Sequence, residues 1–392
     1  MPKGYDKTLH YVVIILAIFG TLMIGSASMG LRIDDTSYSN NLLVKTLVKQ
    51  IVTVIVGYLA MLVLARSFNI KKITAEIVFT TVALTFISLV ACLAFDSVGG
   101  AKAWIRFGIG GTEVTIQPSE FAKITTILII SAYCGDSRKQ YRSTWDSIKI
   151  PAVMILLIGL IVYKMQDDFG SMAVISLIAF VCFQIPANPN MRKFQNLMLV
   201  SAFAVLAIVL FVLSPQGIQY LEKIPFLKEY QRNRFISTVD PFYDYYNTGY
   251  QLTKGLVSFS RGGWFGTGFG SSISKYSDFP AANTDYILAI LVEELGYAGF
   301  LGLFLLYGII LVKCFIYALR IRSERARIFL VGTAAYLLAH TLFNVGGVTG
   351  MIPLTGVPLL MISSGGSSAL SFMMAIGICQ SVISSFNNGK LK

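Results

Sequence analysis

Three carboxylates stand at the start of an otherwise apolar stretch, FPAANTDYILAILVEELG, which covers residues 279–296. A carboxylate can take a proton from an attacking hydroxyl group or bind a cation. Asp285 falls near the expected helix start, where the helix dipole alone also favours an acid. On a helix, Glu293 lies about 80° round from Asp285 and about 12 Å deeper, whereas Glu294 faces the opposite side. The spacing predicts an acid in the first turn (Asp285), a candidate cavity or cation partner deeper along the helix (Glu293) and a contact to another helix (Glu294).

A second polar cluster lies in AKAWIRFGIGGTEVTIQPSEFAKI, residues 101–124. An ammonium group about one turn into an apolar helix normally faces a polar cavity or a partner, and Lys123 is in that position. Glu120, three residues earlier, lies on the same side of the helix. The neighbouring residues have simpler explanations, since Pro118 or Ser119 can start the helix and Trp104 can anchor it at the membrane interface.

Basic residues recur in a third region, the segment 214–284, which is far longer than the other connections. They are Lys223, Lys228, Arg232, Arg234, Lys254, Arg261 and Lys275. Arg binds phosphate through paired N–H donors and Lys binds it as a point charge. Loops of this length are usually functional or disordered, and the aromatic residues mixed with the charges favour order here. The sequence leaves two interpretations open, a phosphate site and a solvated rim.

The elements that must position these residues are membrane helices. The chain has 392 residues, of which 55% are hydrophobic and 13% charged. Its apolar stretches approach the length needed to cross a bilayer core of roughly 30 Å, and lipid leaves helices as the fitting structure. We therefore expect an all-α, polytopic membrane protein with one domain, 1–392, and one large extracytoplasmic loop, 214–284. The expected spans, about ten, are 10–30, 49–66, 75–95, 119–134, 149–165, 170–186, 194–213, 285–312, 328–348 and 366–386.

Charge distribution predicts the orientation. Lys and Arg gather in alternate connections, with Arg138, Lys139 and Arg142 in one and four arginines at 320–327 in another. Because cytoplasmic loops carry this excess, we expect both termini in the cytoplasm. The net charge of +12 is then a topology signal and an attraction to anionic lipid, with no nucleic-acid reader in the sequence. The alternative that the first apolar segment is a cleaved signal peptide is less favoured because its apolar run is long.

Cysteine and histidine indicate no further site. The five cysteines fall within the expected spans or at their ends, so apolar packing explains them. The two histidines, His10 and His340, are far apart in the sequence and predict no zinc-type cluster.

Six motifs together resemble one family. They are GAKAWIRFG, QPSEFAK, QDDFGS, GYQLTKGLVSFSRGGWFGTGFGSSISK, NTDYILAILVEELG and NVGGVTGMIPLTGVPLLMISSGGSS. In this order, across nearly the whole chain, they resemble the SEDS family of shape, elongation, division and sporulation proteins. GYQLT followed by FSRG is more similar to the division branch, FtsW, than to the elongation branch, RodA. The resemblance implies a peptidoglycan glycosyltransferase in the bacterial cytoplasmic membrane, at the division septum, that polymerises lipid II.

The resemblance also implies partners and residue roles. The partners are a class B penicillin-binding protein and the division or elongation machinery. Asp285 matches an essential aspartate, which would take the proton of the acceptor hydroxyl group while undecaprenyl pyrophosphate leaves. Substrate-binding positions would be Lys123, Glu120, Arg106, Trp104, Arg232, Arg234, Lys275, Ser367 and Ser368. Structural or cavity positions would be Gln117, Pro118, Ser119, Asp168, Glu293, Asn344, Gly365 and Gly366. No cofactor is implied with certainty, and no spacing marks a site for the divalent cation, Mg²⁺ or Mn²⁺, that a pyrophosphate can bind.

The sequence departs from the family beside the key acid. The usual PEAHTD reads PAANTD, so that Ala281 and Asn283 replace a carboxylate and an imidazole. Asn283 cannot act by protonation, which favours a divergent donor preference. Two other functions stay open, a lipid II flippase or other transporter and a non-catalytic division scaffold. A transporter predicts polar residues continuing inward, but the apolar run through Leu311 has no charge beyond Glu294.

Overall fold

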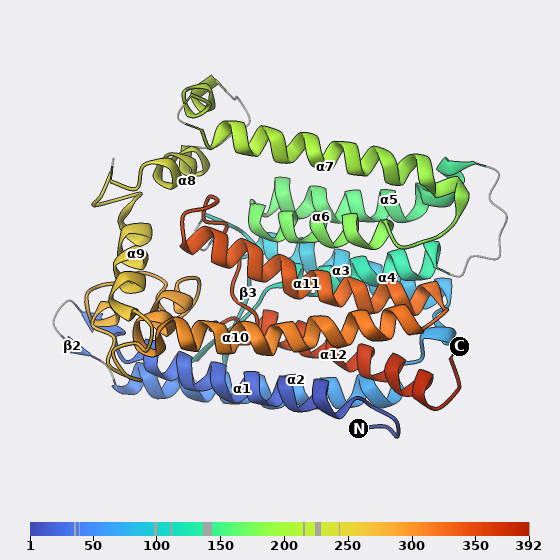
Figure 1. Ribbon diagram of the computed structural model, residues 1–392, viewed down its shortest axis with the longest axis horizontal. Coiled ribbons are helices and arrows are strands. Elements are labelled where there is room, and N and C mark those ends of the chain that lie inside the picture. The colour runs from blue at the N-terminus through green and yellow to red at the C-terminus, as the bar shows by residue number, and fades with distance from the viewer. Residues whose placement is uncertain are drawn as a thin grey trace.

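The long helices run side by side through the molecule in this computed structural model (Figure 1). The structure describes residues 1–34, 37–38, 40–97, 100–109, 112–135, 143–214, 216–223, 229–242 and 244–391. The predicted topology residues Arg138, Lys139 and Arg142, and the predicted loop cation Lys228, lie outside these ranges.

Each of the ten expected spans falls on a helix. These helices are α1 (Lys7–Ser28), α2 (Asn40–Ser67), α3 (Ala75–Ala91), α4 (Pro118–Cys134), α5 (Thr144–Leu160), α6 (Phe169–Phe183), α7 (Arg192–Val212), α10 (Ile287–Arg320), α11 (Glu324–Val348) and α12 (Gly366–Asn387). Among the described residues, eight helices are long and apolar enough to cross a bilayer. The two expected spans outside that set are α4 and α6, with 17 and 15 residues. The protein is thus an all-α integral membrane protein, and the number of spans stays a prediction.

Burial is distributed as in a membrane bundle. Most residues of α4, α11 and α12 are buried, and α4 packs against α6 and α11. None of the residues of α7 is buried, and its apolar side chains, such as Leu197 and Phe203, point outward. Apolar residues on the outer surface are stable when the surroundings are lipid. The exposed apolar faces therefore leave the polar residues of the site to the buried helices and to the segments that connect them.

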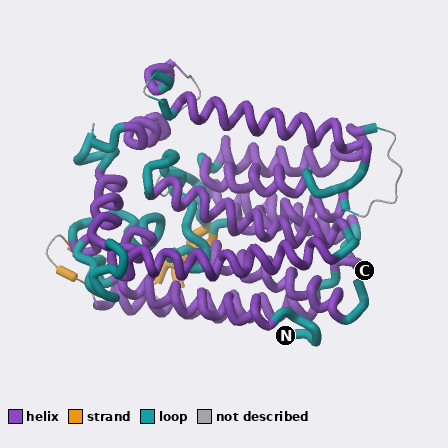
Figure 2. The backbone as a smooth tube through the Cα atoms, viewed as in Figure 1, coloured by secondary structure: helices purple, strands orange, loops and turns teal. Residues whose placement is uncertain are grey.

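The remaining elements are short, and Figure 2 shows that strands are few among the described residues. The shorter helices are η1 (Ile70–Lys72), η2 (Cys92–Ala94), η3 (Ile161–Met165), η4 (Pro189–Met191), η5 (Ile218–Lys223), α8 (Glu229–Val239), α9 (Tyr250–Gly262) and η6 (Ser274–Tyr276). The strands are β1 (Arg32–Asp34), β2 (Ser37–Tyr38), β3 (Ile105–Ile109) and β4 (Thr112–Ile116), paired as two antiparallel hairpins. The hairpin β3–β4 was expected only as a loop, and it places Arg106 opposite Thr115.

Helix α10 begins later than expected and is kinked. It starts at Ile287, so Asp285 lies in the turn before the helix. The sequence had suggested that this residue would lie in the first turn of the helix. Gly296 has φ 68°, a left-handed conformation that favours glycine, and divides α10 into two helices. The glycine-rich segment 261–270 crosses at this kink, where the Thr267 N–H donates to the Glu293 carbonyl over 2.9 Å. Glycines are required because a Cβ atom at Gly262 would lie 2.1 Å from the Val292 carbonyl oxygen.

The two termini lie together at one end of the bundle, opposite α8 and α9 (Figure 1). The Ser384 hydroxyl group donates to the Lys3 carbonyl over 2.6 Å, and the Asn388 amide donates to the same carbonyl over 2.7 Å. The arginine-rich connection between α10 and α11 is at this end too. Both termini therefore emerge on the same side of the protein.

Candidate functional site

A cavity of about 420 Å³ opens at the end of the bundle that carries α8 and α9. Its wall is built from the start of α4 and α6, α8, the turn before α10, the irregular segment 353–365 and the start of α12. The residues that line it include Trp104, Gln117, Asp167, Asp168, Gln231, Arg234, Ala281, Thr284, Asp285, Thr355, Gly356, Pro358, Ser364, Gly365, Ser367 and Ser368. Eight residues predicted for the site are among them: Trp104, Gln117, Asp168, Arg234, Asp285, Gly365, Ser367 and Ser368.

Asp285 is an acid of this cavity whose pKa departs from the ordinary aspartate value. Burial raises the pKa of Asp285 to about 6, although the nearby positive charge of Arg234 acts in the opposite direction. Arg234 is held in place by its donation to the Leu354 carbonyl over 2.7 Å. Asn344 does not line the cavity, but its side-chain amide donates to the Asp285 carbonyl over 2.9 Å. The acid therefore sits on a fixed backbone beside a fixed cation.

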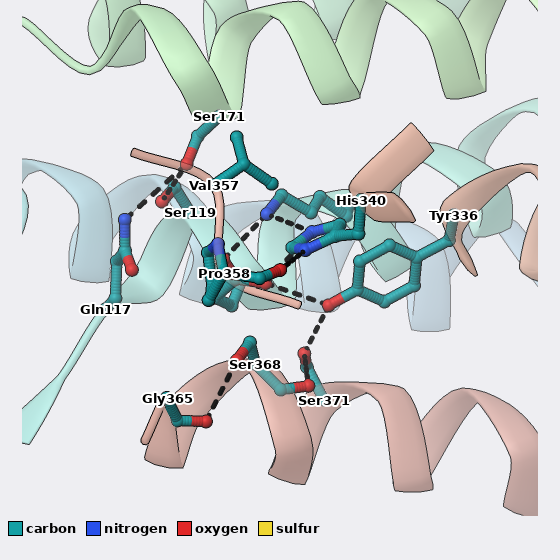
Figure 3. Close-up of polar contacts among 12 residues, drawn as sticks. Gln117, Ser119, Ser171, Tyr336, His340, Val357, Pro358, Gly365, Ser368 and Ser371 are labelled. Atoms are coloured by element: carbon teal, nitrogen blue, oxygen red, sulfur yellow. Dashed lines mark hydrogen bonds and ion pairs between the residues drawn. The ribbon is translucent and has the colours of Figure 1, made fainter. Parts of the chain in front are cut away.

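A polar cluster forms another part of the wall, where α4 and α6 begin, and Figure 3 shows Gln117, Ser119 and Ser171 of this cluster. Gln117 precedes Pro118, the first residue of α4, and donates its side-chain amide to Asp168 over 2.9 Å. Ser119 donates to the same carboxylate oxygen over 3.3 Å, and the Ser171 N–H donates to the other oxygen over 2.9 Å. Asp168 is therefore an oriented acceptor with both oxygens engaged, unlike Asp285.

Beneath the cavity lies a buried charged network. The family resemblance assigned two of its residues, Lys123 and Glu120, to substrate binding. Lys123 and Glu120 are 0% and 1% exposed, and the lysine ammonium donates to the glutamate over 2.7 Å. The same ammonium group lies 2.9 Å from Nε2 of His340, and Tyr336 donates to Glu120 over 2.8 Å (Figure 3). The side chains of Lys123 and Glu120 thus bind each other and α11. Their direct contact with substrate has no support in the cavity lining.

The cations and acids of the outer segment are also paired. Lys275 is buried, not on a surface, and its ammonium donates to Glu294 over 2.8 Å. Glu294 also accepts from Ser26 of α1 over 2.6 Å, which confirms the predicted contact to another helix. Glu293 is buried and accepts from Ser272 over 2.7 Å, with Arg261 at 3.8 Å, and it does not line the cavity. Lys275 and Glu293 therefore hold the outer segment on α10, away from the cavity.

The other predicted residues lie near the cavity without lining it. Arg106 is in β3, Arg232 is in α8, and Gly366 is the first residue of α12. Within the described part of the chain, no group of three or more His, Cys, Asp or Glu side chains is placed to hold a metal ion. The acids Asp240 and Asp244, which lie on the outer segment, are engaged with their own turns. The divalent cation stays a prediction.

Comparison with known proteins places this geometry in a family. The model of the FtsW/RodA/SpoVE cell cycle proteins matches residues 6–388. The chain belongs to this family. One FtsW/RodA/SpoVE relative, the probable peptidoglycan glycosyltransferase FtsW of Bacillus subtilis (strain 168), is 33% identical over 385 residues, covering 97% of this chain and 91% of the relative. A relative of the same name from Legionella pneumophila is 31% identical over 383 residues, covering 95% and 89%.

Solved structures share the FtsW/RodA/SpoVE fold. One is a chain of a peptidoglycan synthase complex, from a structure on the coordination of polymerization and crosslinking by that complex. It superposes with a TM-score of 0.67 at 23% identity, with 98% of both chains covered. The rod shape determining protein RodA of Thermus thermophilus superposes with a TM-score of 0.62 at 22% identity, again over 98% of both chains. At these identities the superpositions establish the fold alone.

Several residues of the site were not singled out from the sequence. Thr284 and Gln231 line the cavity, and His340 and Tyr336 complete the network beneath it. The signal for His340 was present, since a histidine within an apolar helix needs a polar partner. Its partner, Lys123, is 217 residues away in the sequence, and no local spacing reveals such a pair.

Proposed function

We propose that the protein is a peptidoglycan glycosyltransferase that polymerises lipid II into β-1,4 glycan strands, with Asp285 as general base. The observation that carries this proposal is the placement of Asp285, a carboxyl group with a pKa of about 6 that lines a cavity beside Arg234. A base of this pKa is ionised at neutral pH and still accepts a proton readily, which suits general-base catalysis. The names of the FtsW relatives support the same reaction class.

The proposed step is a single displacement. The 4-hydroxyl oxygen of the acceptor GlcNAc attacks the anomeric carbon of the donor MurNAc, and Asp285 takes the hydroxyl proton. The bond from that carbon to the pyrophosphate oxygen breaks, and undecaprenyl pyrophosphate leaves with the bonding electron pair. The α-linked donor becomes a β-linked product. Arg234 is the cation placed to offset the negative charge that develops on the leaving group.

The setting of the reaction is part of the proposal. The cavity would face the outer leaflet and the termini would face the cytoplasm, because the arginine-rich connection between α10 and α11 lies at the end of the termini. The partner would be a class B penicillin-binding protein, which crosslinks the new strands, and the site of action would be the division septum. The structural similarity to a chain of a peptidoglycan synthase complex supports a partner of this kind.

The test is polymerisation of purified lipid II by the wild type and Asp285→Asn, with the transpeptidase partner added. Asparagine keeps the shape and loses the base, so we expect a loss of about 10²- to 10⁴-fold in rate. Asp240→Asn is the matched control, because Asp240 lies on the adjoining outer segment 214–284 and does not line the cavity. Glycan length and rate are read on gels with labelled lipid II.

Two results would contradict the proposal. Equal polymerisation by the wild type and Asp285→Asn would remove Asp285 from the catalytic role. Movement of lipid II across vesicle membranes without polymer formation would favour the flippase function.

A further inference from the structure

The cavity wall contains an irregular backbone segment, 353–365, in which Val357 and residues 359–363 are buried among the helices and Gly356 is exposed. Such a segment is stable only when its carbonyl groups find partners inside the protein, because lipid supplies none. Side chains supply them here, one after another. The Leu354 carbonyl accepts from Arg234, the Val357 carbonyl from Asn344, the Pro358 carbonyl from His340 and the Leu360 carbonyl from Tyr307. The shape of this wall therefore depends on a few donors, and two of them, His340 and Asn344, lie one turn apart on α11.

The contacts of His340 determine where its proton lies. Its Nδ1 is 2.8 Å from the Pro358 carbonyl oxygen, which only accepts, so Nδ1 must carry the hydrogen. Its Nε2 is 2.9 Å from the Lys123 ammonium, which only donates, so Nε2 must be the acceptor. The other charged group facing Nε2 is Glu120, at 3.7 Å, which already accepts from Lys123 and Tyr336. The imidazole is neutral, with its tautomer fixed from both sides (Figure 3).

This histidine is connected to Asp285, the proposed general base, through the wall it holds. Asn344 donates to both the Val357 carbonyl and the Asp285 carbonyl, at 2.9 Å each. Gly356 precedes Val357 in this wall and faces the acid, since a Cβ atom at Gly356 would lie 3.8 Å from the Asp285 carboxylate. A shift of residues 356–358 would therefore move the surroundings of Asp285 directly.

We propose that His340, as a neutral Nδ1–H imidazole bridging the Lys123 ammonium to the Pro358 carbonyl, is a positioning residue for Asp285. Lys123 and Glu120 act through it as a buried anchor and do not touch substrate. The role in activity rests on the proposed function, whereas the tautomer does not.

The first experiment measures the tautomer directly. The chain has two histidines, so selective ¹⁵N-histidine labelling gives signals from His10 and His340 alone, and His10→Gln assigns them. In lipid nanodiscs at neutral pH we expect one neutral imidazole with hydrogen on Nδ1 and none on Nε2. An imidazolium, or a hydrogen on Nε2, at His340 would overturn the proposal, and this result does not depend on any activity.

The second experiment separates positioning from general stability. Glutamine can replace both contacts, since its amide donates to the Pro358 carbonyl while its oxygen accepts from Lys123; leucine can replace neither. We expect His340→Gln to keep kcat within about threefold and His340→Leu to lower it about ten- to a hundredfold, because small misplacements at a reacting centre are costly. Thr341→Val, next along α11, removes a buried hydroxyl group that bonds only within its own helix, and it is the control.

The outcomes distinguish the two proposals. Equal losses in His340→Gln and His340→Leu would overturn the positioning role, as would a full rate in His340→Leu. If the wild type forms no polymer while the NMR spectrum shows the expected tautomer, the proposed function fails and the hydrogen-bond assignment stands. Thermal unfolding of each variant shows whether His340→Leu still folds, and the tautomer measurement keeps the proposal testable if it does not.

Discussion

At the scale of single residues, the site combines one perturbed acid with one fixed cation. Asp285 lines the cavity with a pKa raised to about 6 by burial, and the Arg234 charge lowers it. Other charged groups nearby are already paired, as Lys123 is with Glu120 and Asp168 is with Gln117. Asp285 is therefore the acid of this wall best suited to exchange a proton during turnover.

The pH dependence of polymerisation follows from that pKa. A general base acts when ionised, so the rate should be half of its maximum near pH 6, approach the maximum about one unit higher, and fall about tenfold per unit well below pH 6. Arg234→Gln removes the charge that lowers the pKa of Asp285, so the acidic limb should move to higher pH. Both are measured as kcat/KM for lipid II between about pH 5 and pH 8, with vesicle integrity checked at each pH. A limb near the ordinary aspartate value of 3.8, or a limb unmoved by Arg234→Gln, would contradict this prediction.

At the scale of elements, the glycine-rich segment 261–270 and the kinked helix α10 form one unit. The Tyr297 N–H donates to the Gly263 carbonyl over 2.9 Å and the Thr267 N–H to the Glu293 carbonyl over 2.9 Å, so the two backbones touch on both sides of Gly296. Side chains would hold them apart. This unit is continuous with the turn that carries Asp285, just before α10 begins.

A pair of glycine substitutions tests this packing. Gly262→Ala places a Cβ atom 2.1 Å from the Val292 carbonyl oxygen, so we expect a loss of stability of about 1–3 kcal/mol from overpacking, together with lower activity. Gly302→Ala, in the second part of α10, meets nothing within 4 Å and should be neutral or slightly stabilising, since alanine favours helix. Thermal unfolding in detergent measures both. Equal stability of the two variants would show that the close approach is unimportant.

The elements also show what sequence could predict. Apolar length predicted the positions of α1 to α7 and of α10 to α12, because lipid makes that pattern strong. The hairpin β3–β4 was not predicted, because it depends on a short turn. The kink at Gly296 was not predicted, because it depends on the segment 261–270 that crosses there. Lys275 was predicted as a surface cation, because local spacing in the sequence does not reveal its partner Glu294. Asp285 and Arg234 line one cavity, and both were named as candidate site residues through resemblance more than through residue physics.

At the scale of the whole molecule, the termini lie at the end of the bundle opposite α8 (Figure 1), and α8 is one of the elements that line the cavity. The N-terminal residues are tied to the end of α12 through the Lys3 and Gly4 carbonyls. Every path of the chain from the termini to the cavity therefore crosses the bundle. A membrane around the bundle would separate the two ends.

Cysteine labelling tests this separation and the predicted orientation. The five native cysteines are buried, which leaves a low background. In whole cells, a membrane-impermeant maleimide should label Tyr246→Cys, whose parent side chain is 83% exposed near α9, and should not label Lys3→Cys or Lys390→Cys. All three should react after the cells are opened. Labelling of Lys390→Cys from outside would reverse the predicted topology.

The two buried ion pairs described above have an electrical consequence. Lys123 with Glu120, and Lys275 with Glu294, each combine one positive and one negative charge within 2.8 Å. The work that a membrane potential does on a group depends on the net charge of that group, and it is about 2.3 kcal/mol per elementary charge for each 100 mV crossed. Each pair sums to zero, so the voltage exerts no net force on it. The elements that carry these pairs, α4 for the first and η6 with α10 for the second, can therefore move without these charges being driven, or held back, by the potential of an energised membrane.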